Sequence, residues 1–179
     1  EQLSEQSDIQ SISLSAAQQE VVSKAIDFWQ QIITDTPTAS FRLAAQYDSA
    51  SYYALLGQWQ NAINTWLDFA QRYPQNELTQ NIEAQLLFAY QQTENWEAAA
   101  QILLAQHQAS PDSDDGREAL YQAASFYDRS KNRDLALDSF RKYAHAYPQP
   151  LEMANEARYR MSEFYLESNE ESKRRFWLN

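Results

Sequence analysis

Prolines recur every 37 residues in this sequence of 179, at Pro37, Pro74, Pro111 and Pro148. Three other columns follow the same spacing. They are a small residue at Ala25, Ala62, Ala99 and Ala136, a large apolar one at Trp29, Trp66, Leu103, Phe140 and Trp177, and an aromatic one at Tyr53, Tyr90, Tyr127 and Phe164. A fixed period of this length is typical of architectures that stack one supersecondary unit on the next. The sequence therefore predicts an array of repeats instead of a single globule.

Each unit is expected to contain two helices, because apolar residues recur at intervals of three and four between the prolines. The prolines end the second helix of each unit, since proline cannot continue the hydrogen-bond ladder. Thr38, Asn76 and Ser113 are expected to cap the next first helix. Short polar junctions separate the helices of a unit, at Gly57-Gln58, Glu94-Asn95, Lys131-Asn132 and Ser168-Asn169, where glycine and asparagine tolerate the left-handed backbone of a helix end.

The predicted fold class is therefore all-α, an α–α superhelix built as a solenoid of antiparallel helix pairs. With only two glycines, the chain lacks the tight turns of an all-β fold. The expected organisation is a polar N-terminal arm at 1–14, a half repeat at 15–37, full repeats at 38–74, 75–111 and 112–148, and an incomplete repeat at 149–179. The incomplete unit indicates a fragment of a longer array, with a terminal cap as the alternative.

These columns resemble the tetratricopeptide repeat (TPR), a helix–turn–helix unit of about 34 residues. As in that family, a small residue precedes an aromatic by three positions, as Ala50 precedes Tyr53 and Ala124 precedes Tyr127. The small residue, the large apolar residue and the proline of the second helix then follow at the family's intervals, as Ala62, Trp66 and Pro74 do. The resemblance covers about residues 38–179, and residues 15–37 fit an isolated second helix.

The longer unit and its Tyr-Pro endings, at 73–74 and 147–148, look like TPR proteins of the Gram-negative cell envelope, including outer-membrane assembly lipoproteins. This likeness implies a periplasmic or other cell-envelope location, with the cytoplasm as the alternative.

The resemblance also implies where a partner binds, because the first helices of TPR arrays line a concave face. Side chains projected onto that face suit an extended peptide or a helix laid in a groove. The predicted protein-binding residues are Tyr47, Phe88, Gln91, Tyr121, Asp128, Arg158 and Tyr165. The alternative is that the aromatic ones pack against neighbouring helices.

Charge restricts the class of partner. The chain has a net charge of −11, and residues 1–110 carry three basic side chains against twelve acidic ones. Such a surface repels phosphate backbones, which argues against nucleic acid. No apolar run reaches the roughly 18 residues needed to cross a bilayer, so membrane association is expected only through a partner or a missing segment.

No catalytic, cofactor-binding or metal-ligating constellation is expected, and the chain is predicted not to be an enzyme. It contains no cysteine, and its two histidines, His107 and His145, fit helix-surface positions. The run Pro111-Asp112-Ser113-Asp114-Asp115-Gly116 lacks the closing glutamate of a calcium loop and fits helix capping better.

The favoured function is a non-catalytic TPR scaffold that binds a peptide or helix of a cell-envelope protein. The alternatives are an oligomerisation or spacer array that associates with further copies, and an accessory helical-repeat domain of a larger envelope enzyme.

Overall fold

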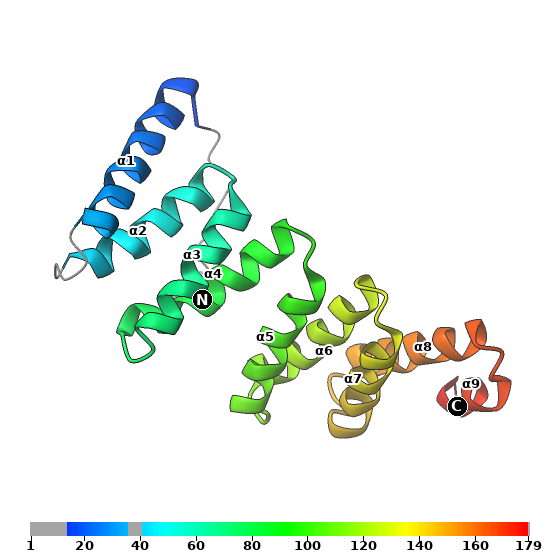
Figure 1. Cartoon of the computed structure of the whole chain (residues 1–179). Coiled ribbons are helices and arrows are strands. Elements are labelled where there is room, and N and C mark those ends of the chain that lie inside the picture. Colours follow the sequence, from blue (N-terminus) through cyan, green and yellow to red (C-terminus); the bar gives the residue numbers. More distant parts are fainter. Residues whose placement is uncertain (1–13, 36–40, 179) are drawn as a thin grey trace, which may run out of the picture. The chain divides into compact units, whose positions relative to one another are not determined.

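A computed structural model describes residues 14–35 and 41–178, and within these ranges every regular element is an α-helix (Figure 1). The chain divides after Ala89 into two compact units. The first contains α1 (Ala16–Asp35), α2 (Arg42–Leu55), α3 (Trp59–Arg72) and all but the last turn of α4 (Glu77–Gln92). The second contains α5 (Trp96–Ala109), α6 (Asp114–Arg129), α7 (Arg133–Ala146), α8 (Leu151–Glu167) and α9 (Glu171–Leu178). The expected all-α class is confirmed.

Successive helices pack side by side in each unit. In the first unit α2 packs between α1 and α3, and in the second unit each helix from α5 to α9 packs on the next. Alanines of the repeat columns are fully buried where two helices meet, as Ala62 is in the first unit and Ala99 and Ala136 are in the second. Large side chains of the apolar column fill the remaining space, among them Trp66 and Phe140. Burial of one such side chain contributes about 1.5–3 kcal/mol, so the columns are the core of the fold.

The helix ends agree with the predicted prolines and capping residues. Helices α3, α5 and α7 each end two residues before a proline. The Asn76 side chain accepts a hydrogen bond from the Leu78 backbone N–H at 2.9 Å, and the Ser113 hydroxyl accepts one from the Gly116 N–H at the same distance. These two predicted caps are confirmed. The predicted cap Thr38 and the arm up to residue 13 lie outside the described residues.

Two of the four junctions inside the helix pairs differ from the prediction. The left-handed residues are Gly57 (φ 69°), Glu94 (φ 54°), Lys131 (φ 62°) and Asn169 (φ 58°). Asparagine was expected to fill this position, but it does so only in the last junction. Asn95 and Asn132 instead cap the following helix. Each side-chain oxygen accepts a hydrogen bond at 3.4 Å from the backbone N–H three residues later. The same junction thus ends one helix and begins the next.

Replacing Glu94 or Lys131 with glycine is expected to stabilise the protein by about 0.5–1 kcal/mol, because glycine adopts positive φ without the steric cost that a side chain meets. Urea unfolding followed by far-UV circular dichroism measures the change. Glu97→Gly, inside the first turns of α5, is the control and is expected to destabilise the protein by about 1 kcal/mol. Loss of stability in Glu94→Gly and Lys131→Gly alike would contradict this account.

The last helix pair is displaced by one residue from the 37-residue period. In the earlier pairs the carbonyls of Tyr53, Tyr90 and Tyr127 accept a hydrogen bond from the backbone N–H five residues later. In the last pair this tyrosine is Tyr165, whose carbonyl accepts from Glu170 N–H at 2.8 Å. The prediction that Phe164 continues the aromatic column is therefore wrong by one residue.

The displacement is already present along most of α8. Its buried residues lie 38 positions after buried residues of α6, and they are Ala154, Ala157, Met161, Ser162, Phe164 and Tyr165. Helix α8 begins at Leu151, 37 residues after α6 begins at Asp114, and it has 17 residues where α6 has 16. The extra residue therefore lies in the first turn of α8, before the first buried residue of the helix.

Candidate functional site

Two predicted binding residues of the first unit help to hold its helices together. The Tyr47 ring lies edge-on to Phe69, with centroids 5.6 Å apart, and its hydroxyl accepts a hydrogen bond from Gln85 Nε2 at 3.0 Å. Phe88 packs edge-on against Trp59 at 5.5 Å. Both predicted residues are half-buried. For Tyr47 and Phe88 the alternative of packing between helices is thus observed.

Two further predicted residues lie near the helix junctions of the second unit. Gln91 is half-buried in the last turn of α4, and its carbonyl accepts a hydrogen bond from the Glu94 N–H at 3.2 Å. Asp128 lies 3.5 Å from Arg133 Nη1, and Arg133 also reaches Glu167 at 2.5 Å. The same guanidinium lies over the Phe164 ring, 4.5 Å from its centroid. Asp128 therefore belongs to a charged cluster that joins α6, α7 and α8.

The displacement of the last pair corrects two predicted residues. A shift of one residue turns a position by roughly 100° around a helix, which moves a surface position into the core. Tyr165 was expected on the binding face but is only 7% exposed, because it takes the core place of Tyr127. Arg158 occupies the position equivalent to the buried Leu120 and not a place on the face.

Tyr121 and Tyr159 occupy equivalent positions on α6 and α8, six residues before the column tyrosines of their helices. Tyr121 is half-buried, with its ring edge-on to Phe140 at 5.8 Å and Tyr143 at 5.4 Å. Tyr159 is 49% exposed. Sequence reasoning missed it, although a spacing of 38 from Tyr121 would have found it.

One ion pair acts on both tyrosines. Arg160 Nε lies 3.0 Å from Glu156 Oε1 on α8. Burial raises the pKa of the Tyr121 hydroxyl, and the Glu156 charge raises it further. A hydrogen bond to Glu163 raises the pKa of Tyr159, with smaller effects from Arg160 and Glu156. Both hydroxyls stay protonated at neutral pH. The two tyrosines and their charged neighbours lie on α6 and α8, which both pack on α7, and together they define the candidate surface.

We call this surface the α6/α8 face. It comprises Glu118, Tyr121, Glu156, Tyr159, Arg160 and Glu163. Aromatic rings and charged groups together supply the apolar contact and the hydrogen-bond partners that a peptide needs. The arrangement is suited to recognition.

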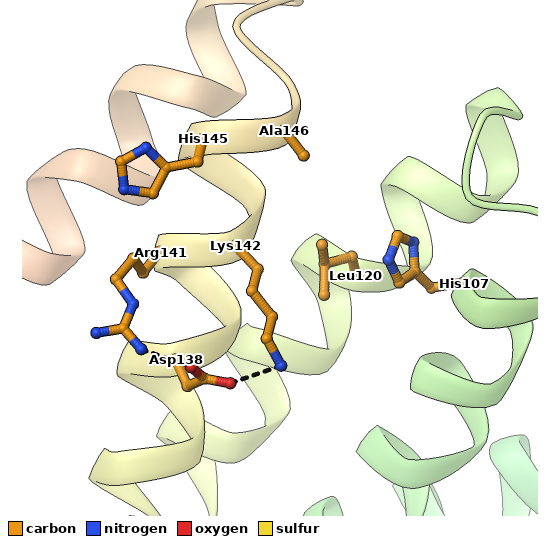
Figure 2. Close-up of a pocket in the computed structure, with 7 residues that line it drawn as sticks. All are labelled: His107, Leu120, Asp138, Arg141, Lys142, His145 and Ala146. Atoms are coloured by element: carbon orange, nitrogen blue, oxygen red, sulfur yellow. Dashed lines mark hydrogen bonds and ion pairs between the residues drawn. The ribbon is translucent and has the colours of Figure 1, made fainter.

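A second feature is a hollow of about 520 Å³ between α5, α6 and α7 (Figure 2). Lys142 Nζ and Arg141 Nη2 each lie 2.7 Å from the Asp138 carboxylate. The hydrogen bond from Lys142, followed by that from Arg141, lowers the pKa of this carboxyl group. The two cations of the hollow are thus already engaged by Asp138.

The histidines that line this hollow have packing contacts. A ring nitrogen of His107 lies 3.0 Å from the Gly116 carbonyl oxygen, and the ring is edge-on to Tyr147 at 6.1 Å. His107 is half-buried, so its predicted place on the helix surface needs correction, because it links α5 to α6. His145 is exposed and lies edge-on to Trp177 at 5.3 Å.

Within residues 14–35 and 41–178, no group of three or more histidine, cysteine, aspartate or glutamate side chains could hold a metal ion. None of the described helices combines the length and apolar character needed to span a bilayer.

Comparison with known proteins gives the class of repeat. Residues 44–76 and 118–150 match the model of the tetratricopeptide repeat. The matches cover the pairs α2–α3 and α6–α7, and the second begins two full periods after the first. These two segments thus match the tetratricopeptide repeat, as their columns predict.

Solved TPR-type structures are also similar to the chain. Nearly identical TPR-like repeats of a Podosopora anserina protein, described as a kinesin light chain, are 15% identical, with a TM-score of 0.49, over 89% of this chain and 86% of that one. MamA from Desulfovibrio magneticus RS-1 is 12% identical, with a TM-score of 0.45, over 88% and 90%. No curated protein matches the chain at the sequence level.

Proposed function

We propose that the protein is a non-catalytic TPR scaffold that binds an extended peptide of a partner protein, and that the α6/α8 face is part of the binding surface. The observation that carries this proposal is the pair of tyrosines, Tyr121 and Tyr159, at equivalent places on successive first helices. Aromatic side chains contribute more than most others to binding energy at interfaces. Tyr159 packs little against its own unit, as its exposure shows.

The proposed partner is a protein of the cell envelope. This part of the proposal depends on the Tyr-Pro endings of the repeats, which look like those of envelope TPR proteins. Fractionation of cells that express the full-length gene at its native level would test it, and recovery in the cytosol alone would contradict it.

Selection from a displayed library of random peptides tests binding and requires no candidate partner. We expect the intact chain to enrich peptides that lose about tenfold or more in affinity when Tyr121 and Tyr159 are both replaced by alanine, since each anchor contributes about 1 kcal/mol or more. Tyr159→Ala alone removes an exposed ring and leaves the core untouched, so it keeps the test valid if the double variant unfolds.

Phe176→Ala is the matched control, because it removes an exposed aromatic from α9, away from the face. Its affinity for the enriched peptides is expected to equal that of the unchanged chain. Enriched peptides that bind Tyr159→Ala as well as the unchanged chain, or that lose affinity equally in Phe176→Ala, would overturn the proposed surface.

A further inference from the structure

The carboxylates of the α6/α8 face are only partly balanced by positive charge. Glu156 is paired with Arg160. Glu118 accepts a hydrogen bond from the neutral Gln122 Nε2 at 2.8 Å, and Glu163 lies one helical turn after Tyr159 on α8. In the described part of the chain, neither Glu118 nor Glu163 forms an ion pair. The face carries three negative charges and one positive charge.

In the second unit, cationic side chains repeatedly lie over aromatic rings. The Arg129 guanidinium lies 4.9 Å from the Trp96 ring centroid, and Lys173 Nζ lies 5.4 Å from that of Tyr165. A cation over an aromatic ring is attracted by the ring's quadrupole. Tyr159 offers a half-exposed ring of the same kind, and the Glu163 carboxylate lies one helical turn further along α8.

We infer that the partner segment bound at the α6/α8 face is cationic, an extended stretch of a protein that carries lysine or arginine residues. This inference depends on the proposed function and adds the chemistry of the partner to it. A lysine or arginine of the segment lies over the ring of Tyr159 and pairs with Glu163. A second cation of the segment pairs with Glu118, beside Tyr121 on α6.

Two fluorescein-labelled peptides of equal length test the inference. Both have a glycine–serine frame, one with several arginines and the other with glutamates at the same places. Fluorescence anisotropy is expected to show that the arginine peptide binds the intact chain at least about tenfold more tightly, and that its affinity falls as salt is added. Tyr159→Ala and Glu163→Gln are each expected to weaken it roughly three- to fivefold.

Glu94→Gln is the matched control, because it removes the same charge at an exposed junction away from the face. Its affinity for the arginine peptide is expected to stay within about twofold of that of the unchanged chain. An equal loss in Glu94→Gln and Glu163→Gln would mean that only the net charge attracts the peptide, and would overturn the inference. Equal or tighter binding of the glutamate peptide would also overturn it.

The library selection separates this inference from the proposed function. Enriched peptides that depend on Tyr159 but are neutral or acidic would refute the cationic partner and leave the peptide-binding scaffold intact. Enriched peptides that do not depend on Tyr159 would refute both.

Discussion

Gly116→Ala is expected to destabilise the protein by about 2–3 kcal/mol, although alanine favours a helix over glycine by about 1 kcal/mol. Gly116 lies in the first turn of α6, where that helix meets the end of α5. A Cβ atom at this position would overlap the Ser110 carbonyl oxygen and lie 2.8 Å from its carbonyl carbon. Backbone atoms cannot move aside as the end of a flexible side chain can. The end of α5 and the start of α6 must therefore move apart.

Urea unfolding of the whole chain, followed by far-UV circular dichroism, measures this effect. Gly57→Ala is the informative control. No atom lies within 4 Å of the Cβ that alanine would add there, so its cost is limited to the left-handed backbone at φ 69°, about 1–2 kcal/mol. If Gly116→Ala were as stable as the unchanged protein, the close approach of the two helices would be refuted.

Phe140→Ala is expected to destabilise the second unit by about 3–5 kcal/mol, because it removes a buried aromatic and leaves a cavity. Phe140 is 1% exposed. Its ring lies 5.8 Å from that of Tyr121 and 6.2 Å from that of Phe164, so it joins α7 to the helices on either side. Since each repeat is stabilised mainly by its neighbours, loss of this side chain weakens two interfaces together.

Leu135→Ala serves as the control for this substitution, on the same helix but at a side chain that is 40% exposed. It is expected to change the unfolding free energy by less than about 0.5 kcal/mol. Thermal and urea unfolding should agree in this ranking. Equal losses in Phe140→Ala and Leu135→Ala would show that the large apolar column does not form the core of the second unit.

Much of the fold was predictable because the same residue types recur at the same positions of several repeats. The period located the helix pairs, and the prolines located the ends of α3, α5 and α7. The close approach of α5 and α6 at Gly116 was not predictable. The run of residues that contains this glycine is explained equally well by helix capping. The left-handed residues Glu94 and Lys131 were missed for a related reason. Propensity favours the neighbouring asparagine, but that asparagine is needed as the cap of the next helix.

The candidate site was harder to predict than the fold. An error of one residue in register hardly moves the predicted end of a helix, but it changes which side chains are predicted on the helix surface. Tyr121 was placed on the binding surface, whereas Tyr165 and Arg158 were assigned with a period that no longer applies in α8. Tyr47 and Asp128 make contacts that the spacing does not predict. Their exposure depends on side chains of other helices, Gln85 and Arg133, whose reach cannot be read from spacing.

The first turn of α8 bears on how such arrays can change length. One extra residue there lengthens the helix at its start and leaves the packed part intact, so a first helix tolerates an insertion before its first buried residue. A consensus sequence averaged over the units at a fixed period would align Tyr127, a core residue, with Phe164. The structurally equivalent residue is Tyr165. Engineered copies of this protein should therefore be aligned on the hydrogen bond that ends each first helix, and a residue added in the first turn of a first helix is expected to change the unfolding free energy little.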